Sequence, residues 1–185
     1  MPWVYLGYVE STQGTAGTWA TTPSKVQTWF EGMLKPGDTV QTKYTTDSAT
    51  ATGATVILID DSIPQNTEGD QYMSLAITPT SAVNILQVEH GGQYESVGGA
   101  LHLTLALFQD STANALTARA SYYGANAENN WLTLHYRMAA GTTSATTFKV
   151  RAGANANSLR FNGYSGSRVY GGACYSYLKV TEIFA

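Results

Sequence analysis

The sequence predicts an all-β fold, an antiparallel two-sheet jelly-roll sandwich, preceded by a short N-terminal arm. Apolar and polar residues alternate in five segments, as they do in strands that bury one face. Clusters of glycine, asparagine, proline and serine separate these segments at intervals of roughly 10–15 residues. No helical pattern lies between them. A total of about eight to ten short strands fits a jelly roll better than an up-and-down barrel.

Residues 1–38 differ from the rest of the chain and predict an arm with one short helix. Thr22 can cap that helix, and Pro23 suits its first position. Four apolar residues follow at the spacing of one helix face: Val26, Trp29, Phe30 and Met33. Because the arm cannot bury this stripe by itself, we expect it to serve in attachment or assembly. The jelly-roll domain is expected to span residues 39–185.

The expected strands are the five segments with period-two alternation. They lie at residues 72–78, 101–107, 131–138, 148–151 and 177–181. Each is expected to present one face to the core and the other to solvent or a partner. Turns are expected at glycine pairs, among them Gly91-Gly92, Gly98-Gly99 and Gly171-Gly172.

Composition and charge exclude several classes of protein. The 185-residue chain has only 12% charged residues and 43% hydrophobic residues, which argues against intrinsic disorder. No apolar run approaches the roughly 20 residues of a membrane span. No secretory signal follows Met1, so we expect a soluble protein. The net charge of -3 argues against a general nucleic-acid binder.

The charge is distributed unevenly along the chain. Residues 1–110 carry three basic and eleven acidic side chains, whereas residues 111–185 carry seven basic and two acidic ones. The simplest interpretation is a neutralised surface, and the alternative is pairing of one subunit with its neighbour. The single cysteine, Cys174, excludes an intramolecular disulfide and is expected to be a buried, inert thiol.

Four segments carry a resemblance to a known family. They are IPQNTEGDQYMSLAITPTSAVNIL (63–86), ALFQDSTANAL (106–116), MAAGTTSATTFKVRAG (138–153) and SLRFNGYSGSRVYGGACYSYLKVTEI (158–183). As an ordered set they resemble the small jelly-roll domain of tailed-bacteriophage virion proteins of the tail-fibre type, over about residues 39–184. The segments 88–99 and 121–131 fit that pattern loosely, as exposed tip loops would.

The resemblance implies a compact homotrimer similar to tumour-necrosis-factor-like modules, in a virion assembled in the host cytoplasm. It also implies that the arm contacts other virion proteins. The sequence itself favours a trimer through a strand face near the C-terminus that bears Tyr175, Tyr177 and Lys179. Such rings are costly to leave in water and are readily buried between subunits.

No combination of residues predicts catalysis, so we expect no enzyme and no cofactor. Ser165 in GYSGS lacks the second glycine of a nucleophile elbow and is expected in a hairpin. His90, His102 and His135 are far apart in the sequence, although His102 and His135 could face a common surface. We expect these histidines to face solvent or an interface, with a metal site as the weaker alternative.

The acidic residues around one proline loop are further candidate metal ligands. Asp60-Asp61 and Glu68-Gly69-Asp70 flank this loop, and carboxylates on a loop can bind calcium. They lack the spacing of a calcium-binding loop, so we expect a solvated or salt-bridged loop and no metal.

Aromatic residues beside glycine- and asparagine-rich loops are the candidate binding residues. They are Tyr94, Tyr122, Tyr123, Trp131, Tyr164 and Tyr170. Rings in such loops can stack on sugars or anchor protein contacts of a host cell surface. The alternative is that they cap the ends of the sandwich or fill seams between subunits.

Taken together, the sequence predicts a non-enzymatic virion protein of the tail-fibre type, used in particle assembly and host-surface attachment. Two alternatives remain open: a capsid decoration or head-fibre protein, and a secreted lectin-like module. A polysaccharide depolymerase is disfavoured because no carboxylate cleft and no β-helix repeat is evident.

Overall fold

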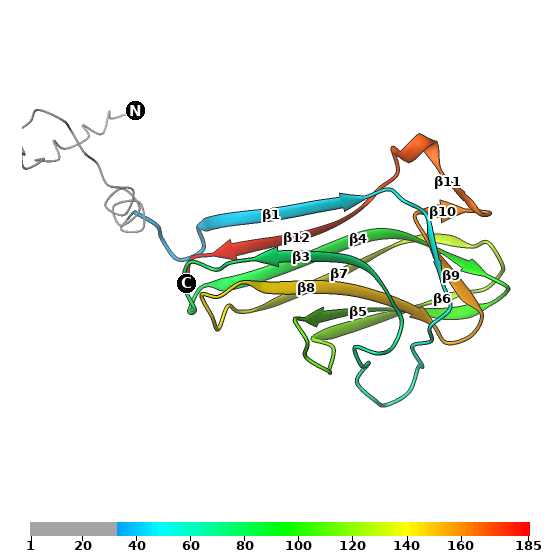
Figure 1. Ribbon diagram of the computed structural model, residues 1–185, viewed down its shortest axis with the longest axis horizontal. Helices are drawn as coiled ribbons and strands as arrows, with labels where there is room; N and C mark the ends of the chain where they lie inside the picture. The colour runs from blue at the N-terminus through cyan, green and yellow to red at the C-terminus, as the bar shows by residue number, and fades with distance from the viewer. Residues whose placement is uncertain (1–32) are drawn as a thin grey trace, which may run out of the picture. The chain divides into compact units, whose positions relative to one another are not determined.

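The computed structural model describes residues 33–185, of which Pro36–Ala185 form one compact unit (Figure 1). Its elements, in chain order, are β1 (Thr39–Asp47), β2 (Ala51–Gly53), β3 (Asp70–Ile77), β4 (Ile85–Val97), β5 (Leu101–Gln109), β6 (Thr117–Tyr123), β7 (Asn129–Ala139), β8 (Thr146–Ala154), β9 (Ser158–Phe161), β10 (Gly163–Tyr164), β11 (Ser167–Arg168), the 3-10 turn η1 (Tyr170–Gly172) and β12 (Ser176–Ile183).

The N-terminal arm lies almost entirely outside the described residues. Val26, Trp29 and Phe30 of the expected helix belong to the part that is not described, and Met33 is the first described residue. The arm and its boundary at residue 38 therefore stay predictions. Within residues 33–185, no helix is long and apolar enough to span a membrane.

The strands pair in a nested order. β1 pairs with β12, β3 with β8, β4 with β7, and β5 with β6, all antiparallel. Two further pairings, β12 with β4 and β5 with β8, join them into two sheets. The first sheet runs β1-β12-β4-β7, with β9 and β2 beside the C-terminal half of β4, and the second runs β3-β8-β5-β6. This is the topology of a two-sheet jelly roll, and the predicted fold class is confirmed.

The core lies between the two sheets. Alternate residues of β4 and β12, such as Leu86, Val88, Leu178 and Val180, face inward from the first sheet. The second sheet contributes Leu103, Leu105, Leu107, Phe148 and Val150. The inner faces of both sheets thus form one continuous apolar layer, as the period-two pattern predicts.

The outer face of β5 is covered, which the alternation did not predict. A small second cluster forms from Ile57, Ala106 and Phe108, because the connection between β2 and β3 folds over this face. Arg151 fixes that connection by donating hydrogen bonds to the carbonyl oxygens of Glu68 and Gly69, at 2.7 and 2.6 Å. β5 is therefore buried on both faces, and its outer face is not available to solvent or a partner.

β4 runs without interruption through the glycine pair expected as a turn. Gly91 and Gly92 lie in the middle of a 13-residue strand, so the prediction of a turn there is wrong. The prediction of an exposed tip loop at residues 88–99 is also wrong, because most of this segment belongs to β4. A Cβ on Gly91 would lie 2.7 Å from Cε1 of Tyr177, and one on Gly92 would lie 2.7 Å from Oγ of Ser176. These glycines allow close approach of neighbouring side chains, which is a known use of glycine inside strands.

Candidate functional site

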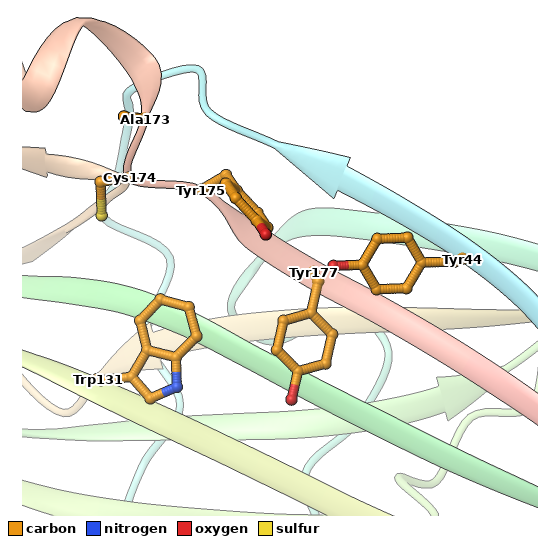
Figure 2. A pocket seen from close by; sticks show the side chains of 6 residues that line it. All are labelled: Tyr44, Trp131, Ala173, Cys174, Tyr175 and Tyr177. Atoms are coloured by element: carbon orange, nitrogen blue, oxygen red, sulfur yellow. The ribbon is translucent and has the colours of Figure 1, made fainter.

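The outer face of the first sheet carries a row of aromatic side chains. Tyr44 comes from β1, Tyr177 from β12 and Trp131 from β7 (Figure 2). The ring centroids of Tyr44 and Tyr177 are 5.9 Å apart with an interplanar angle of 23°, and those of Tyr177 and Trp131 are 6.4 Å apart at 36°. The rings of Tyr44 and Tyr177 are therefore stacked, whereas the Trp131 ring is tilted against Tyr177, and the rings of Tyr177 and Trp131 lie over Gly91.

These rings line an open hollow of about 350 Å³ together with Tyr175, Ala173 and Cys174 (Figure 2). Tyr44 is 53% exposed, Trp131 49% and Tyr175 46%. Desolvation and then interactions with Tyr175 raise the pKa of Tyr44, so the phenol is neutral at physiological pH. We call Tyr44, Trp131, Tyr175 and Tyr177 the aromatic face.

A row of charged residues crosses the same sheet face beside the rings. Lys179 on β12 forms a salt bridge with Glu89 on β4, and Nδ1 of His135 on β7 lies 3.8 Å from Oε1 of the same carboxylate. The three residues are direct neighbours in the strand register. Tyr177 and Lys179 thus lie on one face of β12, whereas Tyr175, expected on the same strand face, precedes the strand. The Lys179 charge is neutralised within the subunit.

A second hollow, of about 370 Å³, lies beside the hairpin of β10 and β11. Its lining consists of Gln93, Asn129, Tyr164, Val169 and Tyr170, and we call it the hairpin hollow. Figure 1 shows the hairpin at the end of the sandwich opposite the C-terminus. Tyr164 is 48% exposed and Tyr170 83%, so both rings are open to solvent.

Two neighbouring residues of the first sheet hold the hairpin in place. Glu95, only 1% exposed, accepts a hydrogen bond from the backbone N–H of Ser165 at 2.9 Å and forms a salt bridge with Arg160. Its strand partner Asn129 donates from Nδ2 to the carbonyl oxygen of Gly163 at 2.9 Å. Ser165 lies in a hairpin, as expected, and its backbone N–H helps to hold that hairpin against Glu95.

Two of the predicted binding residues are in the core. Tyr94 and Tyr123 are fully buried, so the expectation that they lie at the surface is wrong. Tyr94 has the inward parity of β4, and its hydroxyl lies 3.0 Å from Nε2 of His90, while the Tyr123 hydroxyl donates to the carbonyl oxygen of Tyr94. Burial raises the pKa of both phenols.

The other predicted aromatics separate into three places. Trp131 belongs to the aromatic face and Tyr164 and Tyr170 to the hairpin hollow, whereas Tyr122 lies on β6 of the second sheet against His102, with ring centroids 5.0 Å apart. His102 and His135 lie on different sheets, so they do not face the common surface that the sequence allowed. The expectation that His90 faces solvent or an interface is wrong, because its side chain is fully buried.

Four site residues were not predicted from the sequence: Tyr44, Gln93, Asn129 and Val169. Tyr44 lies in β1, whose threonine-rich alternation lacks the leucines that marked the other strands. Gln93 and Asn129 lie in strands of the first sheet, inside the segments 88–99 and 121–131 interpreted as tip loops. The signal that was available for Tyr44 is its period-two relation to Thr42 and Thr46 on the exposed side of β1.

The acidic loop residues satisfy their own turns. Asp60 accepts hydrogen bonds from the backbone and hydroxyl of Ser62, which lower its pKa. Asp70 accepts from both the N–H and the hydroxyl of Thr55. In the part of the chain that the structure describes, no three histidine, cysteine or acidic side chains gather closely enough to hold a metal ion.

No family model matches this sequence, and no curated protein matches it. Among solved structures, the chain is similar to the CBM22-1 xylan-binding domain from Paenibacillus barcinonensis Xyn10C, with 12% identity and a TM-score of 0.37 over 82% of this chain and 99% of that one. It is also similar to the VP2 subviral particle of infectious bursal disease virus, with 14% identity and a TM-score of 0.35 over 80% of this chain and 39% of that one.

A third similarity is to the enzymatically active domain of tailspike protein 4 from bacteriophage CBA120. The identity is 10% and the TM-score 0.27, over 66% of this chain and 18% of that one. This chain thus spans about two fifths of the VP2 chain and less than a fifth of the tailspike chain. Similarities with TM-scores this low do not indicate a function.

Proposed function

We propose that this chain is a non-enzymatic structural protein of a bacteriophage virion, a tail-fibre-type component that acts in particle assembly and host-surface attachment. Support comes from the sequence resemblance over about residues 39–184 and from the jelly-roll topology of the described domain. The observation that carries the proposal is the aromatic face, which a lone subunit leaves half exposed.

The aromatic face suits contact with further copies of this chain. Monomeric proteins rarely leave contiguous apolar patches of more than a few hundred Å² exposed. The sheet around the rings is lined by small residues, since Thr46, Gly91 and Thr133 occupy the register positions beside Tyr177. A face of rings and small side chains allows two such surfaces to pack closely.

The charged row on this face is compatible with burial between subunits. Glu89 is neutralised by Lys179 and approached by His135 within one subunit. Burying an unpaired charge costs several kcal/mol, but a pair that is already formed carries less of that penalty. A homotrimer built through this face can therefore cover Lys179 and Glu89 without leaving either charge alone.

The oligomeric state is the first test. Sedimentation velocity of the full chain at micromolar concentration should give a trimer, and a stable, well-folded single subunit at that concentration contradicts this part of the proposal. Variants of the aromatic face, argued in the Discussion, then locate the interface.

The place of the protein in a particle is the second test. Antibody-gold labelling of purified particles should mark the tail. Labelling confined to the head supports a capsid decoration or head-fibre protein, and absence from particles contradicts a virion role. Removing residues 1–35, which leaves the compact unit Pro36–Ala185 intact, should abolish incorporation while the trimer still forms.

A further inference from the structure

We propose that the hairpin hollow binds a neutral sugar residue. The inference rests on the proposed attachment role for the source of that sugar, a glycan of the host surface. Its physical basis is separate, because it depends on the residues that line the hollow and on how they are held.

Two exposed rings supply apolar faces for the C–H groups of a sugar. Tyr164 and Tyr170 are 48% and 83% exposed, although tyrosine rings in a folded domain usually pack against something. Tyr170 has φ +50°, in the left-handed region that a residue with a side chain adopts only when its surroundings hold it there. Strained residues of this kind concentrate at ligand-binding sites.

The polar side chains in the hollow have hydrogen-bonding capacity that the described part of the chain does not use. Gln93 accepts from Sγ of Cys174 through Oε1, and its amide nitrogen donates to no protein group there. Asn129 is held through Nδ2, while its Oδ1 is buried without a hydrogen-bond partner. Unsatisfied buried polar atoms are rare, but this oxygen has almost no exposed surface, so Gln93 is the side chain that offers a free donor to a ligand.

The hollow is held in a fixed shape before any ligand arrives. Glu95 and Arg160, 1% and 13% exposed, form a salt bridge beneath the hairpin, and Glu95 also fixes the N–H of Ser165. A buried ion pair is a costly way to hold a surface hairpin. The benefit is that Tyr164 is positioned in advance, which reduces the ordering cost of binding.

The lining selects the class of ligand. Its side chains are tyrosine, valine, glutamine and asparagine, so none of the five is charged. A ligand that combines apolar C–H faces with many hydroxyls fits rings next to amides, whereas a carboxylated or sulfated sugar would find no cation in the lining. The volume of about 370 Å³ lies within the roughly 300–1,000 Å³ of small-ligand sites.

The test is a printed array of neutral and acidic glycans probed with the labelled full-length protein, followed by titration with the best-bound oligosaccharide. We expect neutral glycans to be retained in preference to acidic ones. Tyr170→Ala and Gln93→Glu, of which the second keeps the size of the side chain and removes its N–H donors, should each weaken binding at least tenfold. Tyr122→Ala is the matched control, because this residue is 60% exposed on the other sheet.

Three outcomes overturn the inference. It fails if no neutral glycan is retained, if only acidic glycans are retained, or if Tyr170→Ala binds as tightly as the unchanged protein. A change in fold is excluded by requiring both variants to keep the circular dichroism spectrum and sedimentation of the parent. Absence of the protein from particles, with glycan binding retained, instead contradicts the proposed function alone.

Discussion

Gly91 and Tyr177 face each other across β4 and β12, and the tyrosine ring occupies the space that a side chain at residue 91 would need. A Cβ there would lie 2.7 Å from Cε1 of Tyr177 and 2.8 Å from Cζ2 of Trp131. Carbon atoms in contact prefer separations of about 3.5–4.0 Å. The arrangement of the aromatic face therefore depends on the absence of a side chain at residue 91.

Gly91→Ala should disturb the aromatic face while leaving the fold intact. Both rings must move by several tenths of an ångström, and because they are half exposed we expect a loss of about 1 kcal/mol, the low end for overpacking. The near-ultraviolet circular dichroism of Trp131 and Tyr177 should change, and urea unfolding measures the free energy. Gly124→Ala is the matched control, because a Cβ there meets nothing closer than 3.7 Å. Equal effects of the two variants would contradict the role of Gly91.

Acid should weaken the fold through His90, which lies under the aromatic face. Its Nδ1 lies 2.7 Å from the carbonyl oxygen of Tyr177, which can only accept, so Nδ1 carries the hydrogen and Nε2 accepts from the Tyr94 hydroxyl. Burial lowers the pKa of His90 from 6.5 to about 4, although the hydrogen bond to Tyr177 acts in the opposite direction. Between these values the unfolded chain binds the extra proton and the folded chain does not.

The His90 contribution to the free energy of unfolding is therefore complete above pH 6.5 and falls as the pH drops towards 4, by about 3 kcal/mol. Urea unfolding at a series of pH values measures it. His90→Gln should be less stable at neutral pH and should lose this part of the pH dependence. His135→Gln, a change on the outer face, should keep it because His90 is intact. A flat profile between pH 6.5 and 4 in the unchanged protein would refute the prediction.

Glu182 should hold the turn before β4 against the C-terminal strand. Its carboxylate accepts hydrogen bonds from Gln41, from Asn84, and from both the N–H and the hydroxyl of Thr80, at 2.7 to 2.9 Å. Burial acts to raise the pKa of Glu182, but these hydrogen bonds outweigh it and lower the pKa. This contribution to stability is present above the ordinary pKa of 4.5 and is lost as the pH falls through the lowered value.

Glu182→Gln keeps the size of the side chain but replaces one acceptor oxygen by a donor, so we expect a loss of about 1–3 kcal/mol in urea unfolding at neutral pH. Glu68→Gln serves as the control, because the Glu68 carboxylate accepts from the backbone N–H of one nearby residue, Gln65. If the two variants lower the free energy of unfolding equally, the additional hydrogen bonds to Glu182 do not stabilise the fold more than the single one to Glu68.

The jelly roll was predictable because five of its strands, β3, β5, β7, β8 and β12, follow period-two alternation closely. Leu103, Leu105 and Leu107 predict the inner face of β5 correctly. The error on its outer face has a physical cause, since Ile57 covers Ala106 and Phe108 from a connection that shows no pattern of its own. Long-range covering of this kind leaves no local signal in the sequence.

The aromatic residues show the same limit at the candidate site. Composition marks Tyr94 and Tyr164 alike, as tyrosines near glycine and asparagine. Their fates differ because Tyr94 has the inward parity of β4, whereas Tyr164 lies in a hairpin outside the sandwich. β4 contains Gly91 and Gly92, which are unusual inside a strand. These glycines make room for the rings of Tyr177 and Trp131 and for the hydroxyl of Ser176, which are distant in the sequence.

The hairpin of β10 and β11 should lose its fixed position when its buried ion pair is broken. Glu95→Gln removes the charge that pairs with Arg160 and leaves that guanidinium, 13% exposed, without its partner. Breaking buried pairs costs about 3–5 kcal/mol in other proteins. Because the hairpin is peripheral, we expect part of this cost as local loosening, seen as faster hydrogen exchange of the Ser165 amide.

The double variant Glu95→Gln, Arg160→Met controls for that result, because it removes both charges together and should restore much of the global stability. Exchange of the Ser165 amide should stay fast in the double variant, since its carboxylate acceptor is gone. Unchanged exchange in both variants would show that the carboxylate does not hold the hairpin.

A charge placed on the aromatic face should separate the proposed trimer into folded single subunits. Tyr44→Lys puts an ammonium group among Tyr175 and Tyr177, and threefold symmetry repeats it at each copy of the interface. An unpaired buried charge costs several kcal/mol, so the concentration needed for association should rise at least a hundredfold. Tyr44 is 53% exposed in the single subunit, so the fold itself should tolerate lysine.

Tyr122→Lys carries the same change to a similarly exposed tyrosine of the second sheet and should sediment as the parent does. A Tyr44→Lys protein that remains trimeric at low micromolar concentration would place the interface elsewhere, whereas dissociation of both variants would mean that added charge alone, and not the aromatic face, controls assembly.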